Sequence, residues 1–261
     1  MKEKRFPLRI LFGLLSVLFW LLIWWLLSLK VNSPLLLPDP ITVLRRLFEL
    51  LLTVSFWSTV VVSIGRILFG ILIAVVLAIL VAVLSVKTPA CDILLSPLMT
   101  AIRSTPVAAF IILLWIWVGL ESVPTVITVL IVLPVVSKNL EVGIRSIDRT
   151  LLDTCAVFHV SLPKRILVLD IPSVLPFFRA ALKTAVGLGW KAGIAAEIIV
   201  RPTLAIGRMI SDAKYNLNYV DIFAWTLAVV ILSVLIEHLL SLLLPRTSEK
   251  NHQAEGKGDT I

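Results

Sequence analysis

The chain has 261 residues, of which 59% are hydrophobic and 15% are charged. Soluble domains are nearer to 45–50% apolar and about 25% charged. A soluble domain of this size cannot bury that much apolar surface, and a disordered chain would not contain it. Only two cysteines, Cys91 and Cys155, are present. The composition therefore excludes soluble enzymes, disordered chains and disulfide scaffolds, and it predicts an all-α polytopic membrane protein.

The formal net charge of +8 does not indicate nucleic-acid binding. The basic residues lie between apolar runs and at the amino terminus, which is the pattern that orients a membrane protein. His159, His238 and His252 are scattered, and no cluster of ligands has metal-binding spacing. We therefore expect no metal site, no cofactor and no catalytic residue.

About six transmembrane helices are predicted, because a bilayer core of about 30 Å needs about 20 apolar residues. The first apolar run is longer than a signal-peptide core, so an uncleaved helix is expected. The third and fourth runs are short, and their ends are expected to extend past the charges that bound them. In chain order the six runs are 10–29, 67–86, 104–120, 122–137, 177–200 and 222–244.

The distribution of lysine and arginine predicts the orientation. With the amino terminus inside, the inner segments hold 16 of the 24 basic residues and the outer segments hold 7. This excess follows the positive-inside rule, so both termini are expected in the cytoplasm and the chain in the cell (plasma or inner) membrane. The inner segments are 1–9, 87–103, 138–183 and the polar tail 245–261, which is expected to be disordered.

The external segment 30–66 precedes a permease core at 67–244. Turns are expected at 33–34 and 38–40, followed by an amphipathic helix at 41–56. Arg45, Arg46 and Glu49 fall on its polar side, so this helix is expected to lie in the membrane interface.

The inner segment 138–176 is too long and too regular to be a simple connector. Apolar residues at intervals of three and four predict a helix at 140–158. Ser161 is placed to cap a second helix with Pro163 in its first turn, and this helix is expected to reach Leu169 and to end at Pro172. The result is a cytoplasmic helix-turn-helix with a mixed surface suited to another protein.

The same segment resembles a known family. Asp153-Thr154-Cys155, then His159, then Leu169-x-Ile171-Pro172 have the spacing of EAA-x3-G-x9-I-x-L-P. That signature marks the membrane subunits of binding-protein-dependent ABC importers. Further matches lie at Leu37-Pro38-Asp39-Pro40, at Ser63, Arg66 and Gly70, from Pro97 through Arg103-Ser104-Thr105-Pro106, and from Gly189-Trp190 to Ala196-Glu197.

The resemblance covers about residues 30–245 and is closest to the branch that imports aliphatic sulfonates, taurine, nitrate and thiamine or riboflavin precursors. It implies a type I importer permease fold in membrane lipid, a second permease subunit (a homodimer, or a dimer with a similar chain), two cytoplasmic ABC ATPase subunits and an extracytoplasmic solute-binding protein. No G-x-x-x-x-G-K-[ST] motif occurs in these residues, so ATP hydrolysis is expected on a separate subunit. The implied ATPase-coupling residues are Asp153, Thr154, Cys155, Ala156, His159, Leu169, Ile171 and Pro172.

His159 stands where the family signature has glycine. A left-handed conformation there would cost a histidine about 1–2 kcal/mol. Either the turn is built differently, or the second helix is displaced.

Small residues recur every four positions in two of the expected spans. Such stripes allow two helices to approach closely in lipid. They are interpreted either as helix packing within one subunit or as a dimer seam or pathway wall. The stripes are Gly70, Ala74, Ala78 and Ala82, and Ala181, Ala185, Gly189 and Gly193.

Lys191 and Glu197 are charged residues within the fifth span, where exposure to lipid would cost each about 2.5–3.5 kcal/mol. Six residues separate them, so they point about 120° apart and a direct pair is not expected. Glu197 is predicted to hold neighbouring helices or a gate. Lys191 is predicted to meet either an anionic solute or a neighbouring acid or carbonyl. Arg66 and Arg103 are placed at span ends, where snorkelling is an equal explanation.

The predicted function is that of the transmembrane permease of an ABC importer. The expected substrate is a small organic or inorganic anion or a vitamin precursor. The alternative is an autonomous secondary transporter that uses Glu197 as an ion or proton site.

Overall fold

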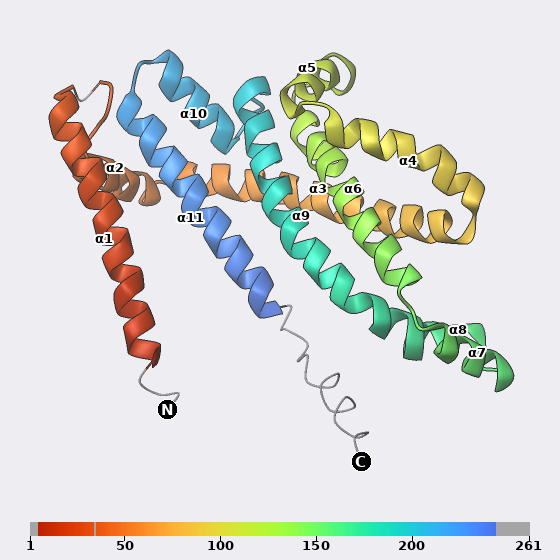
Figure 1. Cartoon of the computed structure of the whole chain (residues 1–261). Coiled ribbons are helices and arrows are strands. Elements are labelled where there is room, and N and C mark those ends of the chain that lie inside the picture. Colours follow the sequence, from red (N-terminus) through yellow and green to blue (C-terminus); the bar gives the residue numbers. More distant parts are fainter. Residues whose placement is uncertain (1–4, 34, 244–261) are drawn as a thin grey trace. The chain divides into compact units, whose positions relative to one another are not determined.

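The computed structural model of the chain describes residues 5–33 and 35–243, and this part contains helices and no strand (Figure 1). The structure therefore agrees with the predicted all-α class. The helices are α1 (Arg5–Val31), α2 (Pro40–Leu51), α3 (Val54–Lys87), α4 (Pro89–Ser104), α5 (Val107–Val118), α6 (Val123–Arg145), α7 (Arg149–Val157), α8 (Leu162–Arg165), the π-helical turn η1 (Ile166–Asp170), α9 (Ile171–Val200), α10 (Ile206–Tyr215) and α11 (Tyr219–Leu243).

The chain forms two compact units. The first contains Met1–Gly70, Pro106–Thr128 and Trp190–Ser233, and the second contains Ile71–Thr105, Val129–Gly189 and Val234–Ile261. Each unit is therefore built from three separate stretches of the sequence, and α3, α6, α9 and α11 contribute residues to both.

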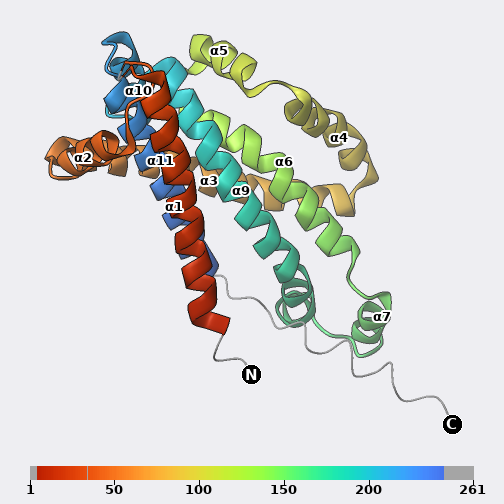
Figure 2. The same cartoon turned by 60° about the vertical axis from the view of Figure 1, so that its left-hand side comes forward.

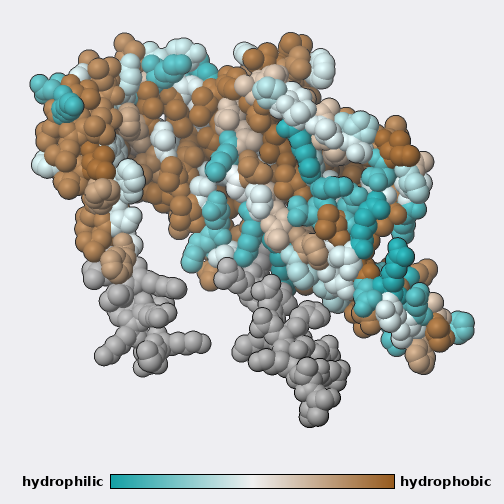
Figure 3. Space-filling model, viewed as in Figure 1, coloured by the Kyte–Doolittle hydropathy of each residue, from teal (hydrophilic) through white to brown (hydrophobic). Residues whose placement is uncertain are grey.

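Several helices are long and apolar enough to cross a membrane. By length and composition α3, α6 and α11 each qualify alone, and α4 with α5 qualifies as a bent pair. Leu15–Val31 of α1 forms a shorter apolar stretch. Hydrophobic side chains cover much of the visible surface, and hydrophilic ones gather in patches (Figure 3). An apolar exterior of this kind is what lipid solvates.

The expected single span at 104–120 is wrong. Helix α5 covers only Val107–Val118, because Thr105 is extended and Pro106 has no N–H to continue α4. It ends at Gly119, whose φ of +75° suits glycine. The expected extension past the bounding charges occurs in α6, which continues to Arg145, but not in α5.

Other boundaries also differ from the sequence prediction. Helix α3 begins at Val54, so 30–66 is not all external loop and interface helix, and α9 begins at Ile171 rather than near residue 177. A further helix, α10, occupies part of the expected outer segment 201–221. Residues 5–9 of the expected amino-terminal segment already belong to α1, whereas residues 1–4 and the expected tail at 245–261 lie outside the described residues.

Helix α2 belongs to the first unit and lies across α1 (Figure 2). The Asp39 carboxylate caps it by accepting from the Thr42 N–H at 2.9 Å and the Thr42 hydroxyl at 2.7 Å. These two hydrogen bonds hold the pKa of Asp39 below its ordinary value, and the one from the hydroxyl has the larger effect. The helix ends at Leu51, not near residue 56. On its polar side Arg46 pairs with Glu49 at 3.2 Å and with Asp221.

Two expectations for 138–176 are wrong. The predicted helix at 140–158 is split, because Asp148 accepts a hydrogen bond from the Thr150 N–H at 2.8 Å and starts the new helix α7. Pro172 does not end a helix, since α8 passes through η1 into α9 and Pro172 occupies the first turn of α9, where its missing N–H is tolerated. Ser161 is the N-cap residue of α8, but its side chain makes no capping hydrogen bond.

Candidate functional site

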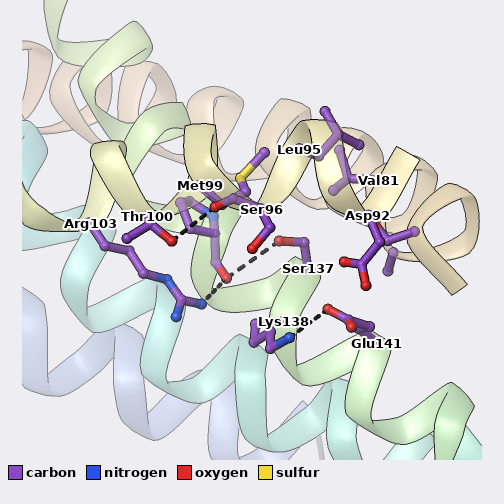
Figure 4. Close-up of a pocket in the computed structure, with 13 residues that line it drawn as sticks. Val81, Asp92, Leu95, Ser96, Met99, Thr100, Arg103, Ser137, Lys138 and Glu141 are labelled. Carbon is purple, nitrogen blue, oxygen red and sulfur yellow. Dashed lines mark hydrogen bonds and ion pairs between the residues drawn. The ribbon is translucent and has the colours of Figure 1, made fainter. Parts of the chain in front are cut away.

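A polar pocket of about 100 Å³ lies in the second unit, where the end of α3 meets α4 and α6 (Figure 4). Most of its lining side chains carry a charge or a hydroxyl group, which is unusual among helices of this hydropathy. The lining residues are Val81, Ala82, Ser85, Asp92, Leu95, Ser96, Met99, Thr100, Arg103, Pro134, Ser137, Lys138 and Glu141.

Two polar contacts fix α4 against α6. Arg103 Nη2 donates to the carbonyl of Pro134, and Arg145 Nη2 donates to Asp92 Oδ2 at 3.1 Å. Asp92 and Arg103 are eleven residues apart on α4, and Pro134 and Arg145 are eleven residues apart on α6. The two helices therefore run antiparallel, and the two contacts lie about 16 Å apart along them.

The charges in the pocket are unevenly compensated. Lys138 pairs with Glu141 at 2.9 Å, and Arg145 pairs with both Glu141 and Asp92 at 3.1 Å. Arg103 has no carboxylate partner among the residues that the structure describes. Figure 4 shows Arg103 with Thr100 at one end of the pocket and Asp92 with Glu141 at the other. The cation without a carboxylate partner therefore lies at one end of the pocket, and the paired charges lie at the other.

The depth of Arg103 differs from the sequence prediction. Its partner Pro134 is eleven residues from each end of α6, which is one of the apolar spans. Arg103 therefore lies beside the middle of a membrane helix and not at a span end. Snorkelling to the interface does not explain an arginine at this depth, and a charged residue there is by default a functional-site candidate.

A second polar cluster, in the first unit, surrounds Glu197. The Glu197 side chain is fully buried, with an exposed fraction of 0%. Its Oε2 accepts from the Ser63 hydroxyl at 2.9 Å and from the Gly207 N–H at 3.2 Å, and its Oε1 pairs with Arg66 Nη1 at 3.1 Å. Ser63 in turn accepts from the Ile206 N–H at 2.9 Å. This carboxylate thus joins α3, α9 and the start of α10.

Arg66 also connects this cluster to the connection between α5 and α6. Its Nη2 contacts Glu121 Oε2 at 2.9 Å and the Thr203 carbonyl at 3.3 Å. Glu121 accepts from both the N–H and the hydroxyl of Thr203. Burial alone would raise the pKa of Glu121, but the Thr203 hydrogen bonds and the Arg66 charge outweigh it and leave this pKa below its ordinary value.

Lys191, the other residue predicted to line the pathway, does not belong to the Glu197 cluster. Glu197 pairs with Arg66 and not with Lys191, which is exposed and has no ion-pair partner in the described part of the chain. From the sequence, Ser63 and Arg66 belong to a family motif and Arg66 is expected at a span end, but their contact with Glu197 is not predicted. The spacing of Ser63 and Arg66, three residues apart and so on one side of α3, was the available signal.

All eight residues of the two small-residue stripes are buried within the chain. A Cβ added to Gly70 would lie 2.8 Å from the Thr125 carbonyl oxygen and 2.9 Å from the Thr128 Cβ. A Cβ added to Gly193 would lie 2.7 Å from Ile67 Cγ1. These glycines therefore allow helices of the first unit to approach closely.

The predicted coupling residues lie on α7, the following turn, η1 and the start of α9. None of the residues of α7, α8 or η1 is buried. Apolar side chains are among the most exposed: Val157 is 74% exposed, Phe158 76% and Val168 70%. We call Arg149–Pro172 the coupling segment from here on.

His159 adopts the conformation that its position in the family signature reserves for glycine. Its φ is +47°, its N–H donates to the Ala156 carbonyl at 3.1 Å, and the Val160 N–H donates to the Cys155 carbonyl at 2.9 Å. This pair of hydrogen bonds forms a Schellman C-cap with histidine in the left-handed position. Neither a different turn nor a displaced second helix is therefore needed to accommodate His159.

Comparison with known proteins supplies the family. Residues 70–249 match the model of the binding-protein-dependent transport system inner membrane component. The chain belongs to this family. The family resemblance inferred from the motifs is therefore confirmed, and the chain is a multi-pass membrane permease of the ABC transporter type.

Curated relatives agree with the predicted branch. The chain is 26% identical to the taurine transport system permease protein TauC of Escherichia coli over 86% of this chain and 83% of that protein. It is 24% identical to the putative aliphatic sulfonates transport permease protein SsuC of Bacillus subtilis, over 94% and 89%. It is 30% identical to the bicarbonate transport system permease protein CmpB of Synechococcus elongatus, over 81% and 80%.

Proposed function

We propose that this chain is the translocating subunit of an ABC importer and that the coupling segment transmits the work of a separate ATPase. The observation that carries the proposal is the surface of α7, α8 and η1, which has no buried residue and exposes large apolar side chains. Such side chains at the polar edge of a membrane protein are typical of a surface that a partner covers.

The structure of the coupling segment suits force transmission. Helix α7 begins at a capped Asp148 and ends in the Schellman turn at His159, so its position is defined at both ends. From Leu162 the chain continues through η1 into the long helix α9 with no intervening loop. A push on α8 is therefore passed directly to a membrane helix, which supports a rocking mechanism between inward-facing and outward-facing states.

We further propose the remaining partners and the orientation. The excess of basic residues supports a cytoplasmic position for both termini and for the coupling segment, where two ATPase subunits would bind. A second copy of this chain would complete the pathway, and an extracytoplasmic binding protein would deliver the solute. Relatives named for taurine, aliphatic sulfonates and bicarbonate support a small anion as the substrate, with a vitamin precursor as the other class that the sequence suggested.

The surroundings of Glu197 argue against the alternative of a secondary carrier. A carboxylate that serves as an ion or proton site must exchange its ligand with water during transport. Glu197 is instead enclosed and held by Ser63, Arg66 and Gly207. We propose that it positions α3, α9 and α10 relative to one another.

Co-purification tests the coupling proposal. The chain would be co-expressed with the ABC ATPase subunits of its own genome and captured in mild detergent, with Phe158→Glu as the test variant. Leu52→Glu is the matched control, because Leu52 is 74% exposed but lies after α2. We expect the ATPase to co-purify with the wild type and the control, and to be lost from Phe158→Glu. Equal recovery with all three would refute a contact at this segment.

A further inference from the structure

We propose that Arg103 is the anion-binding residue of the permease and that the pocket between α3, α4 and α6 takes a small singly charged oxyanion, such as a sulfonate or bicarbonate. This inference rests on the proposed transport function and assigns the substrate group to a residue. It starts from the position of Arg103, which donates to the Pro134 carbonyl at the midpoint of α6.

The pairing of the charged groups at the pocket favours an anion. The lining holds two cations and two carboxylates. Lys138 pairs with Glu141, and Asp92 pairs with Arg145 from outside the lining, so Arg103 is left without a carboxylate partner among the described residues. The uncompensated cation is Arg103, and a guanidinium offers several N–H donors in a planar fork that fits an oxyanion. Only one of its hydrogen bonds is accounted for, to the Pro134 carbonyl, among the contacts of the described residues.

Size and neighbouring groups restrict the ligand further. A volume of about 100 Å³ accommodates a few water molecules or a solute of a few heavy atoms. Ser96, Thr100 and Ser137 also line the pocket (Figure 4). The Thr100 hydroxyl donates to the Ser96 carbonyl at 2.9 Å and the Ser137 hydroxyl to the Pro134 carbonyl at 3.4 Å. Of the three hydroxyls, that of Ser96 is the one suited to donate to an oxygen atom of such an anion. Met99 adds an adaptable apolar surface for a short alkyl chain.

Among the described residues that line it, the pocket has no free carboxylate near Arg103 that could bind the ammonium group of a zwitterionic solute. Asp92 and Arg103 are about 16 Å apart along α4, which is much longer than a short amino sulfonate. Asp92 is also already held by Arg145. An ammonium group at the other end of the solute would therefore find no free carboxylate next to Arg103, so recognition depends on the oxyanion alone.

Cysteine modification tests whether the electrostatic potential in the pocket is positive next to Arg103. Thr100→Cys would be introduced in a Cys91→Ser, Cys155→Ser background of the full chain in membranes. Residue 100 lies one helical turn from Arg103, and both line the pocket. The rate of modification would be measured with sulfonatoethyl methanethiosulfonate, which is an anionic alkyl sulfonate, and with trimethylammonioethyl methanethiosulfonate, which is a cation of similar length.

The ratio of the two rates reports the local potential, because changes in intrinsic thiol reactivity affect both reagents. Removing one positive charge about one helical turn away changes the local concentration of each monovalent reagent about threefold in water, in opposite directions. We therefore expect Arg103→Gln to lower the anion-to-cation ratio about tenfold or more, and Arg103→Lys to keep most of it. Arg45→Gln, which removes the same charge from an 83% exposed side chain on α2, is expected to change nothing.

Protection by free solute completes the test. Ethanesulfonate and bicarbonate are expected to slow the modification with Arg103 present and not in Arg103→Gln, whereas ethylammonium is expected to have no effect. An unchanged ratio in Arg103→Gln, equal protection by ethylammonium, or no modification by either reagent would overturn the assignment. Arg103 has an exposed side chain with a single hydrogen bond, to the Pro134 carbonyl, among the described residues, so folding is expected to survive its replacement by Gln. The assay needs no ATPase, so its failure is distinct from failure of the coupling proposal.

Discussion

Replacing Glu197 by glutamine tests whether the buried cluster of the first unit supports the fold. The carboxylate accepts hydrogen bonds from Ser63, Arg66 and Gly207 and has no exposed surface. Glutamine keeps the shape but has one acceptor oxygen in place of two, and its NH₂ group would face a donor. The substitution therefore removes a charge-assisted hydrogen bond and leaves at least one buried donor without a partner.

These losses determine how far Glu197→Gln is expected to lower the free energy of unfolding. A hydrogen bond to a charged group contributes about 1.5–3 kcal/mol, and an unsatisfied buried donor costs about 1–3 kcal/mol. Arg66 keeps its second partner Glu121, which reduces the loss. We therefore expect Glu197→Gln to lower the free energy of unfolding by about 3 kcal/mol. Glu121→Gln is the matched control, because it removes the other, 55% exposed, carboxylate from Arg66 and should cost about 1 kcal/mol or less.

Reversible unfolding by dodecyl sulfate in mixed micelles, followed by the fluorescence of the eight tryptophans, would measure both free energies. The reasoning predicts a large difference between the buried and exposed acids that contact one arginine. Equal costs, or a neutral Glu197→Gln with a cost for Glu121→Gln, would refute it. A Glu197→Gln chain of normal stability that no longer transports would instead favour the secondary-carrier alternative.

Three further outcomes follow from the geometry. His159→Gly should raise the free energy of unfolding by about 1 kcal/mol, because it relieves the φ of +47°, whereas His159→Val should lower it; thermal unfolding in detergent measures both. Gly207→Ala should prevent α10 from docking, since its Cβ would overlap the backbone of Glu197 and Ile198; limited proteolysis should then cleave near residue 205. Asp39, whose folded pKa is lowered, should stabilise the fold above the ordinary aspartate pKa of about 4, and this contribution should be lost as the pH falls from there through the lower folded pKa. Asp39→Asn should remove this component in pH-dependent thermal unfolding.

Hydropathy was sufficient for the helical class and for three of the six predicted spans, which correspond to α3, α6 and α11, because the length of a spanning apolar run is set by the thickness of the bilayer. It failed at Thr105-Pro106, because α4 occupies an expected inner segment and ends at Ser104, so the third run supplies only the short helix α5. It also failed at Val54–Phe56, where α3 begins well before its strongly apolar part. Local capping by Asp148 and the tolerance of Pro172 in a first turn decided the remaining boundaries.

The site residues were harder to predict, because a sequence gives the position of a residue on its own helix but not its depth beside another. Arg103 precedes an apolar run and therefore seemed to lie at a membrane edge. Only its contact with Pro134 places it beside the middle of α6. The sequence could not predict Arg66 as the partner of Glu197 for the same reason, since the two residues are 131 positions apart and lie on different helices.

The most direct test of the proposed function is solute uptake by proteoliposomes. Vesicles would contain the chain alone or the chain with its ATPase, with binding protein and labelled taurine outside and ATP available to the ATPase. Coupling through Arg149–Pro172 predicts uptake only when ATPase and ATP are both present, and loss of that uptake in Phe158→Glu. Uptake by the chain alone, driven by an ion gradient without nucleotide, would contradict the account.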